Sequence, residues 1–214
     1  MQRAELIQAV RGVAGWLGDD EAWALHEAAR THPAEPPAIT VVEIGSWHGR
    51  STIALANGLR ARGAGTVHAI DPHRGSALHH ATGVPSTRAA FLANVRAAGL
   101  TDYVGVIPTR SSVARARFAD RSVHLLFVDG SHLYEDVLSD IDVWTPALTD
   151  VAIVAFHDAR EEPGVRRVLS ERVEPADSPF HGLRMVDNLL VAEFRRVGHA
   201  TESASGVSAT ARST

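Results

Sequence analysis

Apolar residues near the start of the chain recur every three or four positions, whereas later ones gather in short, nearly continuous runs. Positions 6–17 and 23–29 follow helical spacing, so two short helices are expected first. The next apolar run, 39–44, is rich in β-branched residues and is bounded by Gly45, as expected of a buried strand. The pattern therefore changes from helix to strand near residue 39.

From this strand onward, strand-like runs alternate with helix-sized stretches. Strands are expected at 67–70, 104–107, 123–128 and 152–156, and helices at 48–62, 87–98, 113–118, 134–144 and 165–172. Nearly all-apolar strands separated by helices are typical of a parallel sheet with helices on both faces. Two last runs, 183–186 and 189–194, are separated by only two residues, which allows only antiparallel pairing. The predicted fold is a doubly wound, Rossmann-like α/β fold whose seven-stranded, mostly parallel sheet ends in an antiparallel hairpin.

This pattern divides the chain into three segments. The chain has 214 residues, which suits a single hydrophobic core. Residues 1–35 are expected to form a helical lid or a homodimer contact, and 36–197 the α/β domain. Residues 198–214 are rich in Ser, Ala, Thr and Gly, and they are expected to form a disordered tail.

Composition excludes several classes of function. Hydrophobic residues make up 45% and charged residues 21%, the balance of an ordinary globular protein. A formal charge of -4 offers no basic surface for nucleic acid or an anionic membrane. There are no cysteines, which excludes thiolate metal sites and cysteine nucleophiles. No segment approaches the roughly 18 apolar residues of a membrane span, so a cytoplasmic protein is expected.

The turn after the first strand is shaped for a nucleoside. Gly45 and Gly49 allow a tight turn and a close backbone approach at the start of a helix. A dinucleotide site normally has a further glycine between such a pair, where the backbone meets a pyrophosphate, and Trp47 takes that place here. The turn therefore fits a nucleoside cofactor without phosphates better than it fits NAD. An NAD-dependent oxidoreductase is the alternative function. A plain strand-to-helix turn remains the non-functional interpretation.

The second strand ends in an acidic residue. In open parallel sheets, ligands bind beyond the carboxyl ends of the strands, and an acid at the end of strand two accepts hydrogen bonds from ribose hydroxyls. Asp71 occupies this place. The non-functional alternative is a loop cap before Pro72.

These residues resemble those of a known family. The segment E-I-G-S-W-H-G-R-S-T followed by A-I-D-P is similar to motifs I and II of class I S-adenosylmethionine-dependent methyltransferases. The segments F-V-D-G-S-H-L-Y and A-F-H-D resemble the metal-dependent branch that methylates oxygens of small molecules such as catechols and macrolide sugars. The resemblance extends over about 39–194, and it implies a role in natural product biosynthesis.

The resemblance implies S-adenosylmethionine as the methyl donor and a small hydroxylated molecule as the acceptor. It identifies the cofactor-binding residues as Glu43, Gly45, Ser46, Gly49 and Ser51 at the first turn, Asp71 on the ribose, Ser111 and Ser112 near the adenine, and Asp129.

Two carboxylates follow neighbouring strands of the predicted sheet. Asp129 and Asp158 each come at the end of a strand, and neighbouring strands lie about 4.8 Å apart. Two like charges this close repel unless a cation lies between them. The family pattern implies Asp129, His157 and Asp158 as metal ligands. Oxygen ligands favour Mg²⁺, whereas an imidazole shifts the preference toward Mn²⁺, Fe²⁺ or Zn²⁺. Helix capping is the structural alternative.

A histidine follows the first carboxylate by three residues. His132 is placed to face the same cleft, and histidine is well suited to accept a proton near neutral pH. We therefore expect a metal-assisted O-methyltransferase in which His132 is the general base. The alternative to an enzyme is a catalytically silent S-adenosylmethionine-binding module.

Overall fold

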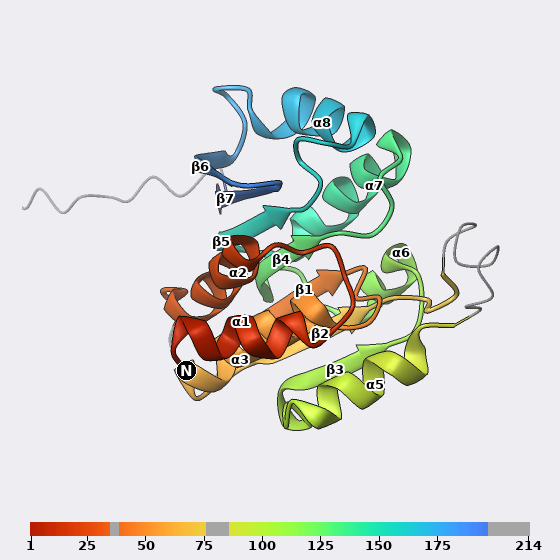
Figure 1. The fold of residues 1–214 in the computed structure, drawn as a ribbon. Helices are drawn as coiled ribbons and strands as arrows, with labels where there is room; N and C mark the ends of the chain where they lie inside the picture. Colours follow the sequence, from red (N-terminus) through yellow and green to blue (C-terminus); the bar gives the residue numbers. More distant parts are fainter. Residues whose placement is uncertain (35–38, 76–85, 197–214) are drawn as a thin grey trace, which may run out of the picture.

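A seven-stranded sheet forms the centre of the protein (Figure 1). The structure, a computed structural model, describes residues 1–34, 39–75 and 86–196. The strands are β1 (Thr40–Ile44), β2 (Thr66–Ile70), β3 (Val104–Ile107), β4 (Val123–Val128), β5 (Leu148–Phe156), β6 (Phe180–Val186) and β7 (Leu189–Arg195).

The strand order is β3-β2-β1-β4-β5-β7-β6. Strands β1 to β5 are parallel to one another, whereas β7 pairs antiparallel with both β5 and β6. The order reverses between β1 and β4, which makes their carboxyl ends the expected place for a ligand. The doubly wound fold with its terminal hairpin is confirmed.

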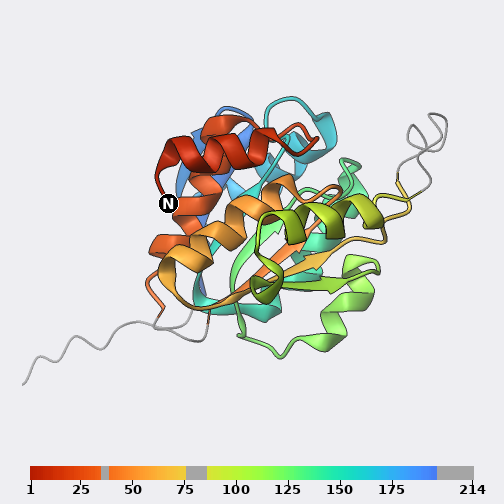
Figure 2. The ribbon, with the colours of Figure 1, turned by 60° about the horizontal axis from the view of Figure 1, so that its bottom comes forward.

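Helices cover both faces of this sheet (Figure 2). One face carries α1, α2, α3 and α5, and the other carries α6, α7 and α8. Their bounds are α1 (Arg3–Arg11), α2 (Asp19–Thr31), α3 (Arg50–Arg62), α5 (Arg88–Ala97), α6 (Ser111–Ala114), α7 (Tyr134–Trp144) and α8 (Pro163–Val168). Short 3₁₀ turns occupy Thr101–Tyr103, Arg115–Arg117 and Thr145–Ala147, and a π-helical turn, Leu169–Val173, extends α8.

Alternate strand residues supply the two hydrophobic cores. Val41 and Leu125 pack with α1, α2 and α3, whereas Val42 and Leu126 pack with α7 and α8. This alternation follows from the two-residue period of a strand, whose successive side chains point to opposite faces. Burial on both faces explains why the parallel strands read as continuous apolar runs.

The N-terminal helices differ from the predicted pattern at their ends. Helix α1 ends at Arg11, although Val13 and Leu17 in the following connection are still buried. Helix α2 begins at Asp19, earlier than expected, because the Glu21 carboxylate accepts a hydrogen bond from the amide of Gly18. Both helices pack in the same core as the sheet. Whether they also act as a lid or a dimer contact stays a prediction.

Two predicted features lie partly or wholly outside the described residues. The tail at 198–214 is one, and the linker before β1 is described only in part. Among the helices that the structure describes, none combines the length and the apolar character that crossing a membrane requires.

Candidate active site at the ends of the central strands

The turn after β1 is pressed against the end of β4. Gly45 has a φ of +84°, and a Cβ atom added there would lie 2.1 Å from the carbonyl oxygen of Asp129. No other residue type fits this contact without moving the backbone. The predicted cofactor turn and the predicted metal-binding strand end are therefore immediate neighbours.

Asp71 at the end of β2 holds this turn in place. Its Oδ2 atom accepts hydrogen bonds from the amides of Ser46 (3.0 Å) and Trp47 (2.8 Å). Its Oδ1 atom accepts one from the amide of His73 at 2.6 Å. A carboxylate can accept about four hydrogen bonds, and the described residues use three of these positions on Asp71. The structure thus adds a scaffolding role to the predicted contact with ribose.

The side chain of Trp47 is covered by the connection between α1 and α2. Trp47 has a φ of +41°, a left-handed conformation that is unusual for a large side chain. Its ring stacks on His48 at 3.8 Å between centroids and contacts Trp16 at 4.6 Å. Arg50 Nη1 donates to the carbonyl oxygen of Gly15 at 2.8 Å. The N-terminal segment therefore packs directly on the predicted cofactor turn, a contact that no pattern in the sequence predicts.

Glu43 lies underneath the turn and is fully buried. The hydroxyl of Ser51 donates to it at 2.5 Å, and the hydroxyl of Thr52 donates to its other oxygen. Burial raises the pKa of Glu43 from 4.5 to about 8. The hydroxyl of Ser46 is also buried, and it has no hydrogen-bond partner among the described residues. The Ser46 hydroxyl is thus a polar group in the turn that could still bind a ligand.

The loop after β3 carries the two serines predicted near adenine. The hydroxyl of Ser111 donates to the carboxylate of Asp140 on α7, and Ser112 is exposed. Burial raises the pKa of Asp140 to about 6. The Ser111 side chain is therefore occupied in linking α6 to α7.

Four predicted residues meet where β4 and β5 end. The two strands are parallel, with Val128 paired to Phe156, so Asp129 and His157 leave the sheet side by side. One ligand atom from each of Asp129, His132 and Asp158 lies within 4.8 Å of the others. His132 Nε2 is 3.0 Å from Asp158 Oδ2.

His157 lies deeper than His132 and faces the same carboxylates. It is buried, with Nδ1 at 3.2 Å from Asp129 Oδ1 and 3.3 Å from Asp158 Oδ2. Its other ring nitrogen, Nε2, is 3.3 Å from Oε2 of Glu21 on α2. The structure thus brings together all three predicted metal ligands and the predicted base.

The electrostatics of this cluster depend on its two histidines. Burial lowers the pKa of His157, but hydrogen bonds with Asp129, Asp158 and Glu21 outweigh burial and raise it. The hydrogen bond with Asp158 raises the pKa of His132. Desolvation raises the pKa of Asp129, whereas hydrogen bonds from the two histidines outweigh the desolvation of Asp158 and lower its pKa. The carboxylate pair thus favours positive charge around it.

Two residues that are not among the predicted site residues support this cluster. Glu21 Oε1 accepts a hydrogen bond from the amide of Asn188 at 2.8 Å. Asn188, in the turn between β6 and β7, donates from Nδ2 to Asp158 Oδ1 at 2.9 Å. From the sequence alone, Glu21 resembles any acid in the first turn of a helix, and Asn188 resembles any turn residue. No local pattern identifies either one.

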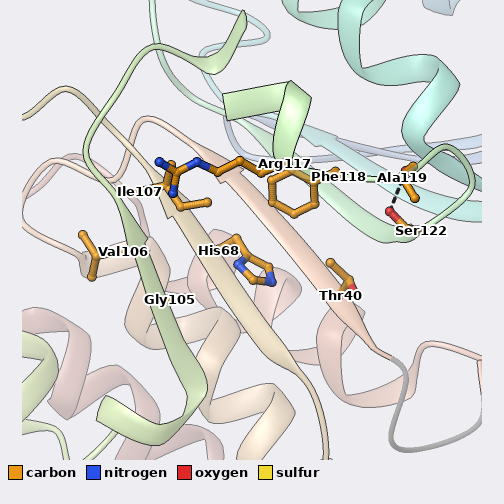
Figure 3. Close-up of a pocket in the computed structure, with 9 residues that line it drawn as sticks. All are labelled: Thr40, His68, Gly105, Val106, Ile107, Arg117, Phe118, Ala119 and Ser122. Atoms are coloured by element: carbon orange, nitrogen blue, oxygen red, sulfur yellow. Dashed lines mark hydrogen bonds between the residues drawn. The ribbon is translucent and has the colours of Figure 1, made fainter. Parts of the chain in front are cut away.

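A cavity of about 480 Å³ lies elsewhere on the sheet (Figure 3). It is bordered by Thr40 at the start of β1, His68 in β2 and Phe118 before β4. It shares no lining residue with the predicted cofactor or metal sites. The strand ends, where the titratable groups gather, therefore remain the candidate site.

The donor set suits a divalent cation. Two carboxylates with an imidazole match the oxygen and nitrogen ligands of Mg²⁺ or Mn²⁺. In the part of the chain that the structure describes, the Ser46 hydroxyl of the adjacent turn has no partner and Asp71 has one acceptor position unused. Both predicted ligand classes are thus compatible with the residues present.

Solved structures resemble this fold over most of its length. A protein from Corynebacterium glutamicum is 18% identical, with a TM-score of 0.65 over 91% of this chain and 92% of that one. The O-methyltransferase NovP is 19% identical, with a TM-score of 0.70 over 84% and 81%. The O-methyltransferase TomG from Streptomyces achromogenes, in complex with SAM, is 18% identical, with a TM-score of 0.60 over 91% and 89%. At these identities the likeness establishes the fold.

Sequence comparison identifies the family. Among curated proteins, the uncharacterized protein y4gI of Sinorhizobium fredii is 51% identical over 39 residues, which are 18% of this chain and 4% of that protein. The model of a methyltransferase domain family matches residues 42–159, more than half of the chain. The matched segment contains the turn after β1, Asp71 and all four residues of the histidine and carboxylate cluster. The chain therefore belongs to the methyltransferase domain family.

Proposed function

We propose that this protein transfers the methyl group of S-adenosylmethionine to a hydroxyl oxygen of a small molecule. The observation that carries the proposal is the contact between Gly45 and the Asp129 backbone. It puts a turn suited to a nucleoside beside a cluster that can bind a cation and accept a proton. Membership of a methyltransferase family supports this chemistry over that of an NAD-dependent oxidoreductase.

The methyl donor binds at the turn after β1. Asp71 uses its remaining acceptor position for a ribose hydroxyl, and Ser46 turns its hydroxyl to the donor. Glu43 supports the turn from below through Ser51 and Thr52. Ser111 and Ser112 border the adenine at the end of β3. TomG, whose structure contains SAM, shares this fold.

His132 accepts the proton of the acceptor hydroxyl. It is the more exposed of the two histidines, and Asp158 holds its Nε2 atom. The resulting oxyanion attacks the methyl carbon of the sulfonium in line, the carbon–sulfur bond breaks, and S-adenosylhomocysteine leaves. Asp129, His157 and Asp158 would hold a Mg²⁺ or Mn²⁺ ion, whose positive charge would stabilise negative charge on the acceptor oxygen.

Calorimetry and turnover test the proposal in two parts. The protein is titrated with S-adenosylmethionine and then incubated with pools of phenols, sugars and hydroxylated peptides, with release of S-adenosylhomocysteine as the readout. Binding followed by acceptor-dependent release is expected with Mg²⁺ or Mn²⁺. Absence of S-adenosylmethionine binding contradicts the proposed activity. Turnover that survives exhaustive EDTA treatment contradicts the metal part alone, and binding without turnover in any pool favours the silent binding module.

A further inference from the structure

Glu21, in the first turn of α2, has unusually many partners for a buried acid. Its carboxylate accepts hydrogen bonds from the amides of Gly18 and Asn188 and lies 3.3 Å from His157 Nε2. Those three partners belong to the start of α2, the β6–β7 turn and the end of β5. A buried carboxylate is costly unless its oxygens are satisfied, and here three donors surround it. Glu21 therefore joins three segments that are far apart in the sequence.

The carboxylate of Glu21 faces one ring nitrogen of His157, Nε2. Both oxygens of Glu21 accept a hydrogen bond from a backbone amide, Oε2 from Gly18 and Oε1 from Asn188. Because both oxygens already act as acceptors, the hydrogen of this contact is assigned to His157 Nε2, 3.3 Å from Oε2. The opposite nitrogen, Nδ1, faces Asp129 and Asp158 at 3.2 and 3.3 Å, the two carboxylates that would hold a cation with it.

We infer that Glu21 is a positioning residue that fixes the tautomer and orientation of His157, so that Nδ1 is presented as a ligand to a divalent cation. The inference rests on the metal part of the proposed function. Histidine ligands commonly donate their second ring N–H to a carboxylate, which orients the ring and strengthens the bond to the metal. Asn188 links the two acids: its side-chain Nδ2 donates to Asp158 Oδ1, and its backbone amide donates to Glu21. The N-terminal helix α2 is thereby part of the metal site.

Glu21→Gln is the direct test, because it keeps the side-chain shape and replaces one acceptor oxygen with an amide donor. An amide facing His157 Nε2 donates to it, which moves the imidazole hydrogen to Nδ1 and removes the ligand atom. We expect the Mn²⁺ dissociation constant, measured by calorimetry and by the EPR signal of free Mn²⁺, to rise by about 10- to 100-fold. The matched control is Glu27→Gln, which makes the same charge change on the same helix at a residue paired with Arg30.

Nitrogen NMR of the histidine rings supplies a readout that a loss of stability does not imitate. In wild-type protein with bound Mg²⁺, His157 should carry hydrogen on Nε2, and in the glutamine variant on Nδ1. Glu21→Asp retains the charge but retracts it by one methylene, so it should keep the wild-type tautomer with intermediate Mn²⁺ affinity. This variant serves if Glu21→Gln fails to fold, and retained S-adenosylmethionine binding verifies the fold of each.

Three results would overturn the inference. One is a folded Glu21→Gln variant that binds Mn²⁺ as tightly as the wild type. If Glu21→Gln does not fold, the same result in Glu21→Asp counts instead. Another is hydrogen on Nδ1 of His157 in the Mg²⁺-loaded wild-type protein. The third is a wild-type protein that binds S-adenosylmethionine and transfers methyl groups but binds no divalent ion. This third result leaves the methyltransferase proposal standing, whereas failure to bind S-adenosylmethionine removes the proposed function itself.

Discussion

The two halves of the candidate site depend on different kinds of chemical group. The turn after β1 depends on backbone geometry, with a glycine that contacts Asp129 and amides held by Asp71. The ends of β4 and β5 depend on charged side chains, which Glu21 and Asn188 hold from distant segments. The first half consists of groups close in sequence or on neighbouring strands, whereas the second needs the whole fold. Substitutions should therefore affect methyl-donor binding in one half and chemistry in the other.

The largest effect is expected at His132. His132→Gln should lower kcat/KM by about 10²- to 10⁴-fold while the affinity for S-adenosylmethionine is retained. The pKa of His132 is raised above 6.5 by the hydrogen bond with Asp158, and a base must be unprotonated. In the wild type, kcat/KM should thus increase with pH up to a pKa above 6.5 and then level off, and this rise should disappear in the variant. The exposed His181→Gln is the control, and an unchanged pH profile in His132→Gln would exclude His132 as the base.

The next effect concerns the carboxylate that touches both histidines. Asp158→Asn should reduce kcat/KM by about 10²- to 10³-fold, because charge stabilisation by a bound metal contributes several kcal/mol. Affinity for S-adenosylmethionine should stay within about twofold of wild type. Asp136→Asn, on the exposed side of α7, removes an equal charge away from the cluster. If Asp158→Asn weakened donor binding as much as turnover, the two halves would not be separable.

Two glycines with nearly the same conformation test the half of the site formed by the turn after β1. Gly45 and Gly63 have φ values of +84° and +87°, but an added Cβ meets the Asp129 carbonyl oxygen at Gly45 and nothing within 4 Å at Gly63. Both alanine variants incur the cost of a left-handed residue, about 1–3 kcal/mol. Gly45→Ala should lose about 1–3 kcal/mol more in urea unfolding through overpacking, and also its donor binding. Equal losses in the two variants would mean that the contact with β4 is unimportant.

The smallest effect on donor binding is expected for Glu43, beneath the turn. Burial raises its pKa from 4.5 to about 8, so its proton favours the folded state below pH 4.5 and that contribution is lost as pH rises through 8. Glu43→Gln mimics the protonated acid, so the stability of the variant relative to wild type should increase between pH 5 and 9 in thermal unfolding. Its donor affinity should hardly change if Glu43 only supports the turn. A large loss of affinity would instead place Glu43 on the methionine moiety.

Much of the fold could be predicted because the pattern of each element is local. The β-branched run before Gly45 and the two-residue turn at 187–188 specify a strand and a hairpin with little help from the rest of the chain. Element ends were less predictable. Helix α3 starts at Arg50 rather than residue 48, because Gly49 adopts a left-handed φ of +88°.

The sequence by itself determined the doubly wound sheet, the turn at Gly45 and the meeting of Asp129 with Asp158, because residues that end adjacent parallel strands must emerge at one edge. Only the tertiary structure decided that Asp71 holds the turn, that Trp16 packs on Trp47, and that Glu21 and Asn188 brace His157 and Asp158. The physical reason is the range of the contacts. Glu21 and His157 lie 136 positions apart, and such a contact exists only after the helices have packed on the sheet.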